Sequence, residues 1–286
     1  MSDQPWTVGR LLHWTAEWLG TRGSEFPRLD AEVLLSHVLS CSRIELYTTF
    51  DKVVADEPRT AFRELLRRRA DGAPVAYLTG QREFFSLPFK VTPAVLVPRP
   101  ETEQLVVRAI DLYRKSGKLR IVDVGTGSGN IAITLAKHLP AAVITAIDIS
   151  NDALAVAKQN AEFHGVADRI DFIHGNLFDA CDLKMQWDLI VSNPPYIREE
   201  EFDGLPRDVR MHEPKEALIA GPRGVEVIER LARESVTRLL CGGWLLIEIG
   251  PPEESEQAVD ACLHLKRHPT LLDLADIPRV IHAQMQ

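Results

Sequence analysis

The chain has 286 residues, 45% of them hydrophobic and 26% charged, which is the composition of a folded protein rather than a disordered one. Its length exceeds the roughly 100 to 200 residues of a single domain, so we expect one large domain with a small appendage. The formal net charge of -8 disfavours a long contact with phosphate backbones and suits small-molecule or protein partners better.

The cysteines and the hydropathy pattern argue against a disulfide framework and a membrane protein. The four cysteines include no Cys-x-x-Cys pair, which indicates reduced thiols and no zinc site. Neither a signal peptide nor a run of 18 apolar residues is present. We therefore expect a cytoplasmic protein without a metal ion.

Residues 1–72 read as a small helical domain. Apolar side chains recur at helical spacing in two stripes, Leu11, Leu12, Trp14, Trp18 and Leu19, then Val33, Leu34, Val38 and Leu39. A third helix is predicted over Pro58–Ala70, ended by the turn residues Asp71 and Gly72. We interpret its run Arg67–Arg69 as solvated surface, with a docking patch for an acidic partner as the alternative.

Residues 73–100 differ in character, because five prolines interrupt short β-rich pieces. Glu83–Phe85 and Phe89–Val91 are predicted to pair as a hairpin. This segment is interpreted as a structured linker.

Residues 101–286 alternate short apolar runs with amphipathic helical stretches, which is typical of a parallel sheet covered by helices on both faces. The predicted strands are Arg120–Val124, Val143–Asp148, Ile170–His174, Leu189–Ser192, Trp244–Ile249, Leu271–Ala275 and Val280–Ala283. The last two are separated by a proline-containing turn, which favours an antiparallel closing hairpin. The sequence thus predicts an α/β fold, a Rossmann-like, doubly wound and mostly parallel sheet.

A glycine loop follows the first of these strands: Gly125, Thr126, Gly127, Ser128 and Gly129 precede a helix predicted over Ile131–Leu139. Glycines allow a tight turn and a close approach of the backbone to a ligand, and the helix N-terminus offers N–H groups to a carboxylate or a phosphate. A simple strand-to-helix turn is the alternative interpretation.

Asp148 ends the next predicted strand, 148 − 129 = 19 residues after Gly129, which is about the distance expected of a ribose-binding acid. Its carboxylate could accept both ribose hydroxyls, or it could cap the following helix, a role that Ser150 would fill equally well. Loop and acid together favour an adenosine-containing cofactor. They do not separate NAD from S-adenosylmethionine, although Gly-x-Gly-x-Gly is closer to a methyltransferase loop.

Asn193-Pro194-Pro195-Tyr196 follows the fourth strand, at the edge where ligands bind in open sheets. The Asn193 side-chain oxygen and the Pro194 carbonyl can accept the two N–H bonds of a planar NH₂ group. Held in this way, the nitrogen would aim its lone pair at a methyl donor, and Tyr196 could stack on the planar substrate. A rigid proline turn is the alternative.

These motifs resemble those of amino-group methyltransferases of the class I fold. Pro74–Gly80, Val97–Glu103 and Glu213–Gly221 further resemble release-factor glutamine methyltransferases of the HemK/PrmC family, over nearly the whole chain. The resemblance implies S-adenosylmethionine as cofactor and class 1 peptide-chain release factors as protein substrates, methylated on the glutamine of a Gly-Gly-Gln loop.

The resemblance also implies roles for particular residues. Gly125–Gly129, Asp148, Asn176, Leu177 and Asn193 would line the cofactor, and Asn193–Tyr196 would hold the glutamine, with Asn193, Pro194 and Tyr196 as catalytic residues. Gly175–Phe178 departs from the acid followed by an aromatic residue expected there, which puts the adenine contacts in doubt. The helical domain 1–72 would dock the protein substrate, the hairpin linker would span 73–100, and 101–286 would form the methyltransferase domain.

Other possibilities stay open. His264 and His268, four apart on a predicted helix, could bind a metal ion, but a third ligand is missing nearby. A nucleic-acid methyltransferase could use the same Asn193-Pro194-Pro195-Tyr196 slot on a flipped adenine or guanine, although the net charge counts against stable nucleic-acid binding. A non-catalytic module that binds a cofactor or partner and regulates translation is the alternative outside enzymes.

Overall fold

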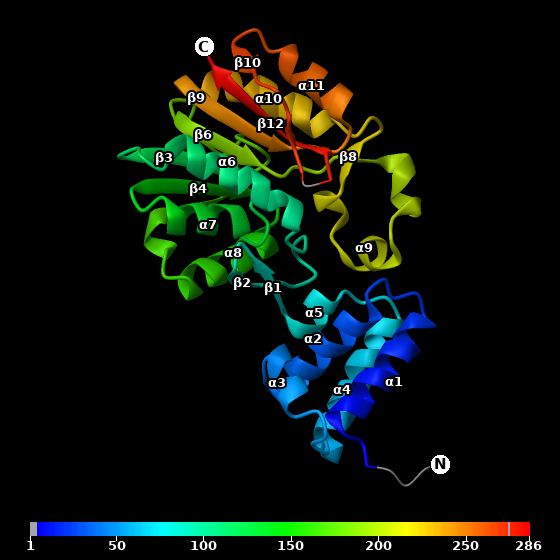
Figure 1. The fold of residues 1–286 in the computed structure, drawn as a ribbon. Helices are drawn as coiled ribbons and strands as arrows, with labels where there is room; N and C mark the ends of the chain where they lie inside the picture. The colour runs from blue at the N-terminus through cyan, green and yellow to red at the C-terminus, as the bar shows by residue number, and fades with distance from the viewer. Residues whose placement is uncertain (1–4, 274) are drawn as a thin grey trace. The chain divides into compact units, whose positions relative to one another are not determined.

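The computed structural model describes residues 5–273 and 275–286, which form two compact units (Figure 1). The first unit contains the residues up to Gly80 and Arg207–His212. The second contains Gln81–Pro206 and Glu213–Gln286. The division falls within residues 73–100, for which the sequence predicts a linker, and residues 1–4 of the predicted helical domain lie outside the described residues.

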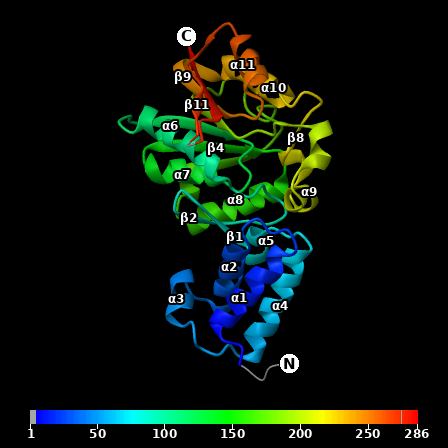
Figure 2. The same ribbon diagram turned by 45° about the vertical axis from the view of Figure 1, so that its right-hand side comes forward.

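The first unit is built mainly of helices (Figure 2). They are α1 (Val8–Gly20), α2 (Pro27–Leu39), α3 (Arg43–Thr48), α4 (Asp56–Ala70), α5 (Val75–Thr79) and α9 (Arg207–His212). Leu12, Leu34, Leu35 and Phe62 are buried in one apolar core, as the helical spacing of apolar residues predicts. Trp14 is an exception, since it is exposed and stacks on Trp18.

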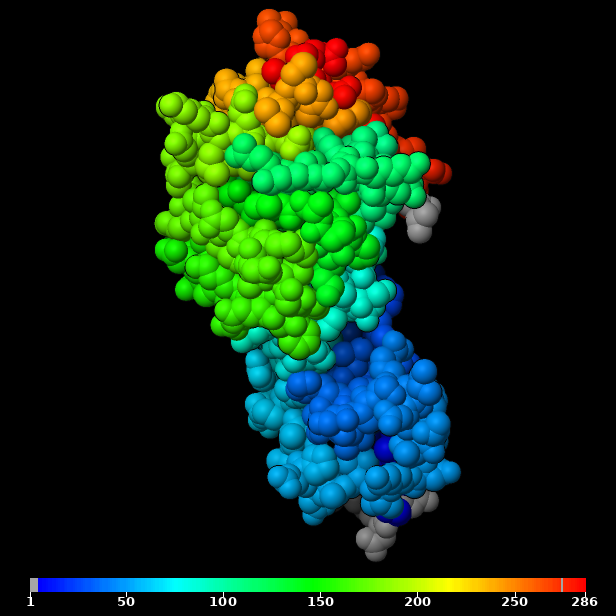
Figure 3. All heavy atoms as spheres, turned by 90° about the vertical axis from the view of Figure 1, so that its left-hand side faces the viewer, coloured from blue at the N-terminus to red at the C-terminus, as the bar shows by residue number. Residues whose placement is uncertain are grey.

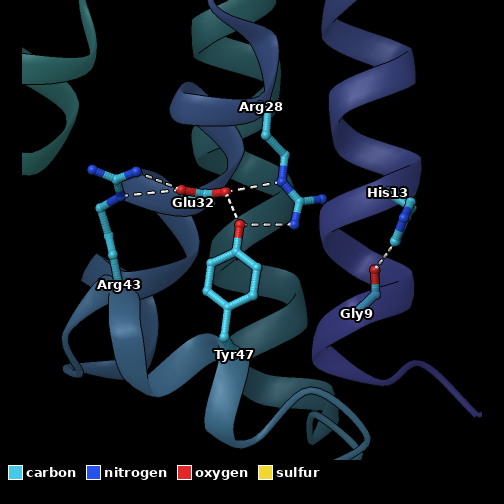
Figure 4. Close-up of polar contacts among 6 residues, drawn as sticks. All are labelled: Gly9, His13, Arg28, Glu32, Arg43 and Tyr47. Atoms are coloured by element: carbon cyan, nitrogen blue, oxygen red, sulfur yellow. Dashed lines mark hydrogen bonds and ion pairs between the residues drawn. The ribbon is translucent and has the colours of Figure 1, made fainter.

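Ion pairs to buried carboxylates join the helices of this unit. The carboxylate of Glu32 on α2 accepts from Arg28 at 2.9 Å and from Arg43 of α3 at 2.7 Å, and it also bonds the Tyr47 hydroxyl (Figure 4). Arg69 of α4 bonds Asp30 of α2 at 2.8 Å and is only 14% exposed. The interpretation of Arg67–Arg69 as solvated surface is therefore wrong for Arg69, because this long side chain folds back onto a buried carboxylate.

The second unit begins with the predicted hairpin. Strands β1 (Gln81–Phe84) and β2 (Leu87–Lys90) pair antiparallel, which confirms the expectation from the sequence. Phe84 and Phe89 turn inward and are fully buried against the core of the second unit. The hairpin is thus packed into this unit.

The central sheet has the order β10-β12-β9-β6-β3-β4-β5, with β11 paired to β12. Its strands are β3 (Leu119–Val124), β4 (Ala142–Asp148), β5 (Ile170–His174), β6 (Trp187–Ser192), β9 (Leu239–Glu248), β10 (Leu265–Arg267), β11 (Leu271–Leu272) and β12 (Pro278–Met285). The pairs from β5 to β9 are parallel, and β12 runs antiparallel to β9. The mostly parallel sheet and its antiparallel closing strands confirm the predicted fold class.

Helices cover both faces of this sheet. In Figure 3, atoms from the middle of the chain, coloured green, form much of the visible surface of this unit. One face packs against α6 (Glu103–Tyr113), α7 (Asn130–His138) and α8 (Asn151–Phe163), and the other against α10 (Glu226–Arg238) and α11 (Pro252–Asp260). A short parallel pair, β7 (Ile197–Arg198) and β8 (Ile219–Gly221), and the 3-10 turns η1 (Pro100–Thr102), η2 (Ala167–Arg169), η3 (Glu199–Gly204) and η4 (Lys215–Ala217) complete the unit.

Three sequence predictions fail near the C-terminus. His264 and His268 do not share a helix, because α11 ends at Asp260 and the strand β10 lies between them, paired with β12. Strand β9 begins five residues before the predicted Trp244, and Gly242 takes a positive φ of 78° within it. Of the predicted strand Leu271–Ala275, β11 contains only the first two residues, and residue 274 lies outside the described residues.

The strand register sets the position of the functional site. Val124 pairs with Ile147 of β4 and with Ser192 of β6, and Ser192 pairs with Ile247 of β9. The next residues along these four strands therefore form one row at the carboxyl edge of the sheet: Gly125, Asp148, Asn193 and Glu248. Between β3 and β6 the strand order reverses, which is where open α/β sheets bind their ligands.

Candidate active site

A cavity of about 420 Å³ opens at this carboxyl edge, within the usual size range of ligand sites. Its floor is formed by the glycine loop Gly125–Ser128, by Asp148–Ser150 after β4, and by Asn193 and Pro195 after β6. Its remaining walls come from the segments on either side, at Ala94–Leu96, Pro98, Arg99, Thr102, Pro214, Glu216 and Ala217. Motifs in the sequence predict most of the floor, whereas most of the wall residues were singled out only by the resemblance of their segments to one family.

The glycine loop has the conformation that requires glycine. Gly125, Gly127 and Gly129 have φ angles of 74°, 54° and 80°. A Cβ on Gly125 or Gly127 would meet no atom within 4 Å, whereas one on Gly129 would lie 2.9 Å from Ile133 Cδ1. The first two glycines therefore leave room for a ligand, and the third allows the loop to pack on α7.

A buried acid that sequence reasoning missed holds the loop from below. Asp123 Oδ2 accepts from the Thr126 hydroxyl at 2.7 Å and from the Ala132 backbone N–H at 3.1 Å. Complete burial raises the pKa of Asp123 to about 7. Its position two residues before Gly125, between the apolar residues Val122 and Val124, is the signal that could have identified it.

Asp148 lies beside the loop, 8% exposed. Its Oδ2 accepts from the Gly127 N–H at 2.8 Å and its Oδ1 accepts from the Ser150 N–H at 2.9 Å. Burial raises the pKa of Asp148 above its ordinary value, although these backbone donors oppose the shift. Ser150, rather than Asp148, caps α8 by accepting from the Ala153 N–H, so the alternative interpretation of Asp148 as the cap is wrong.

Asn160 on α8 also escaped the sequence reasoning. It is 1% exposed and donates from Nδ2 to the carbonyls of Ser128, at 2.8 Å, and Lys90, at 3.0 Å. Its Oδ1 accepts from the Lys90 N–H at 2.8 Å. One side chain thus ties the glycine loop to the β1–β2 hairpin across 70 residues of sequence.

The four residues after β6 are held in different environments. Asn193 lines the cavity and donates from Nδ2 to Thr102 Oγ1 at 3.2 Å. Pro195 also lines the cavity, whereas Pro194 is buried, and the Tyr196 ring lies on Gly250, where an added Cβ would come within 2.5 Å of Cδ2. Burial raises the pKa of Tyr196 to about 12. In the described part of the chain, Pro194 and Tyr196 do not line the cavity itself.

Asn176 and Leu177 follow β5 but lie outside the cavity lining of the described residues. Asn176 Oδ1 accepts from Arg230 of α10 at 3.0 Å. Leu177 has a φ of 55° and packs against the core beneath α10. The structure thus directs the Asn176 side chain toward a surface arginine.

Two wall segments are joined by an ion pair. Glu213, 6% exposed, accepts from the Arg99 guanidinium at 2.6 Å and from the Val97 N–H at 3.2 Å. These residues belong to the segments Val97–Glu103 and Glu213–Gly221, whose resemblance to one family was noted from sequence. Their joint position on the cavity wall gives that resemblance a structural reason.

The described residues contain no group of three or more His, Cys, Asp or Glu side chains that could hold a metal ion. Within the same residues, no helix combines the length and the apolar character that crossing a bilayer requires.

Comparison with known proteins defines the class first. A family model described as "Methyltransferase small domain" matches residues 102–208. The fold resembles the catalytic domain of hMettl16, solved with a MAT2A 3'UTR hairpin, with a TM-score of 0.55 and 18% identity over 78% of this chain and 82% of that one. It also resembles the T. thermophilus 16S rRNA N2 G1207 methyltransferase, solved with AdoMet and guanosine, with a TM-score of 0.54 and 14% identity over 72% of this chain and 50% of that one. The chain is a methyltransferase with the class I fold.

Sequence relatives give the family. A model described as "PrmC N-terminal domain" matches residues 10–80. The release factor glutamine methyltransferase of Rhodopirellula baltica is 52% identical over 256 residues, covering 87% of this chain and 86% of that protein. That of Nitratidesulfovibrio vulgaris is 40% identical over 273 residues, covering 96% and 91%. This chain belongs to the family of release factor glutamine methyltransferases.

Proposed function

We propose that this protein transfers a methyl group from S-adenosylmethionine to the side-chain amide nitrogen of the glutamine in the Gly-Gly-Gln loop of class 1 peptide-chain release factors. The family to which the chain belongs supports the reaction. The observation that carries the assignment is the orientation of Asn193, whose NH₂ group is engaged by Thr102.

The described residues of the cavity fit this cofactor. The open space above Gly125 and Gly127 admits a ligand close to the backbone, and the N-terminus of α7 favours the methionine carboxylate. A carboxylate has about four acceptor sites. Backbone donors use one on each oxygen of Asp148, which leaves acceptor sites for the two ribose hydroxyls.

S-adenosylmethionine supplies an electrophilic methyl group bonded to a positively charged sulfur. The task of the protein is then to hold a poor nucleophile, because the lone pair of an amide nitrogen is delocalised. The oxygen and the nitrogen of a planar amide diverge from one trigonal carbon, so with Nδ2 of Asn193 directed at Thr102, Oδ1 faces a different direction. Asn193 Oδ1 and the Pro194 carbonyl would each accept one N–H of the substrate and direct its nitrogen at the methyl group.

Further roles complete the proposal. Pro195 and Tyr196 would confine the planar amide, with the Tyr196 ring held in place on Gly250. Thr126 and Ser128, which line the cavity, would contact the cofactor, whereas Gly129 would contribute by allowing the loop to pack on α7. Asn176 and Leu177 are retained as adenine contacts only through family resemblance, since Asn176 bonds Arg230 here.

The helical domain 1–72 would dock the release factor, and the protein would act in the cytoplasm, where release factors work on the ribosome. The family match over residues 10–80 supports a role of this region shared among relatives. No membrane and no stable nucleic-acid partner is part of the proposal.

The decisive experiment incubates the protein with methyl-labelled S-adenosylmethionine and purified release factors, followed by mass spectrometry of the loop peptide. One methyl group on the loop glutamine is expected, and Asn193→Ala provides the inactive control. Label on nucleic acid with the glutamine unmodified would instead favour a nucleic-acid methyltransferase. In that case the affinity of the protein for nucleic acid should fall steeply as the salt concentration rises. Absence of transfer to any substrate would favour the non-catalytic regulator.

A further inference from the structure

Three polar side chains from separate elements lie together at the wall of the cavity, in the order Asn193, Thr102 and Glu248. Asn193 Nδ2 donates to Thr102 Oγ1 at 3.2 Å. A side-chain hydrogen bond with Thr102 lowers the pKa of the Glu248 carboxyl group, against the larger rise that its burial causes. Thr102 is 1% exposed and Glu248 is 2% exposed. Glu248 ends β9 one residue after Ile247, which pairs with Ser192, so it lies at the strand end next to Asn193.

The chemistry of these three groups determines which of them donates a hydrogen bond and which accepts it. A hydroxyl carries one proton, and an ionised carboxylate can only accept. When Glu248 is ionised, Thr102 donates its proton to the carboxylate and has only its oxygen lone pairs for Asn193. Those lone pairs require the NH₂ end of the Asn193 amide, which matches the observed bond.

The burial of Glu248 is only partly compensated by the residues around it. Removing a carboxyl group from water is costly, and Oε2 of Glu248 has no hydrogen-bond partner among the described residues. The acidic Glu101 nearby adds to this cost, whereas Arg99 and Arg279 partly offset it. A buried acid that is only half satisfied, next to a cavity, calls for a functional reason.

We propose that Thr102 and Glu248 are positioning residues that fix the orientation of the Asn193 amide, so that its oxygen and not its NH₂ group faces the substrate. This inference rests on the proposed function, because it explains how the site selects a primary amide. A slot lined by acceptors binds the N–H groups of glutamine and rejects the carboxylate of glutamate.

The main test removes the Thr102 hydroxyl while keeping its shape. Thr102→Val should lower kcat/KM for the release factor by about tenfold or more, since a misplaced reacting group can cost about a hundredfold. Thr102→Ser retains the hydroxyl and should restore activity to within about twofold. Thr145→Val, which removes a hydroxyl from the buried Thr145 of β4, is the matched control and should leave kcat/KM unchanged. S-adenosylmethionine affinity should be the same in all of these variants.

Glu248→Gln tests the last of the three residues, the one farthest from the substrate. A glutamine can donate from its NH₂ group to Thr102, which would let Thr102 donate to Asn193 and reverse the amide. We expect kcat/KM to fall about tenfold or more, in a variant that is folded and binds the cofactor normally.

Two measurements separate positioning from a general structural role. In an Asn193→Ala background, Thr102→Val should cause little further loss, because its effect passes through Asn193; additive losses would overturn the proposal. The side-chain NH₂ resonances of Asn193, assigned by their disappearance in Asn193→Ala, should shift in Thr102→Val and not in Thr145→Val.

The two proposals fail in distinguishable ways. If the wild-type protein leaves the loop glutamine unmodified, the proposed function is wrong. The NH₂ resonances of Asn193 would still show whether Thr102 fixes the orientation of its side-chain amide. If the wild type methylates that glutamine but Thr102→Val or Glu248→Gln is equally active, the positioning role is wrong.

Discussion

Replacing Asp148 with asparagine removes the acceptor assigned to the cofactor ribose while keeping the shape of the side chain. Both carboxylate oxygens already accept a backbone N–H, from Gly127 at 2.8 Å and from Ser150 at 2.9 Å. Asparagine has only one oxygen, so its NH₂ group must face one of these two donors. The variant therefore loses a backbone contact and at least one acceptor for a ribose hydroxyl.

The size of the effect follows from the charge of this acceptor. A hydrogen bond to a charged group contributes about 1.5 to 3 kcal/mol, and each 1.4 kcal/mol is about tenfold in affinity. We therefore expect Asp148→Asn to weaken S-adenosylmethionine binding by about 10- to 150-fold. Isothermal titration calorimetry measures the Kd directly, and Asp152→Asn, at an exposed acid in the first turn of α8, is the matched control.

The pH dependence has a definite sign. Burial raises the pKa of Asp148, and protonation removes the charge that the ribose hydroxyls require, so wild-type affinity should fall as pH is lowered toward that pKa. Asp148→Asn should lack this fall. A Kd for Asp148→Asn within about twofold of the wild type would show that Asp148 does not bind the ribose, because even the weakest charged hydrogen bond is worth more.

Three further predictions concern the substrate end of the site and Glu248. Asn193→Ala should lower kcat by more than about tenfold while changing the cofactor Kd by less than about twofold, because the lost acceptor positions the substrate nitrogen; equal losses in both would contradict this role. Replacing the loop glutamine of the release factor with asparagine should lower methyl transfer by about a hundredfold, since it withdraws the nitrogen by one methylene, and comparable labelling of the two loops would argue against the slot. Burial raises the pKa of Glu248 from 4.5 to about 7. Between these pH values the folded chain holds a proton that the unfolded chain has released, so the free energy of unfolding of the wild type should fall, relative to Glu248→Gln, as pH rises from 4.5 to 7. Denaturant titrations of both proteins across this range check it, and parallel pH profiles would refute it.

The sequence by itself determined the local structures of the cofactor site. An apolar strand, three glycines and an amphipathic helix follow one another between Leu119 and His138, and each is encoded by neighbouring residues. The glycines at positions 125, 127 and 129 take positive φ angles, which other residues rarely adopt. Asn193–Tyr196 was recognised for the same reason, since adjacent prolines restrict the backbone wherever they occur.

Short elements were harder to predict, because tertiary contacts decide their conformation. His264 and His268 have helical spacing, but the intervening residues Leu265–Arg267 pair with β12. For a segment of three residues, a ladder of backbone hydrogen bonds to an existing strand outweighs a weak helical preference.

Only the tertiary structure decided how the functional groups are oriented. Gly125, Asp148, Asn193 and Glu248 form one row because four strands share a register, which no single segment encodes. Thr102 lies 91 residues from Asn193 in sequence, and yet this contact determines which end of the Asn193 amide is engaged. The sequence names the chemical groups, but the direction of a hydrogen bond depends on the partner that the fold places beside it.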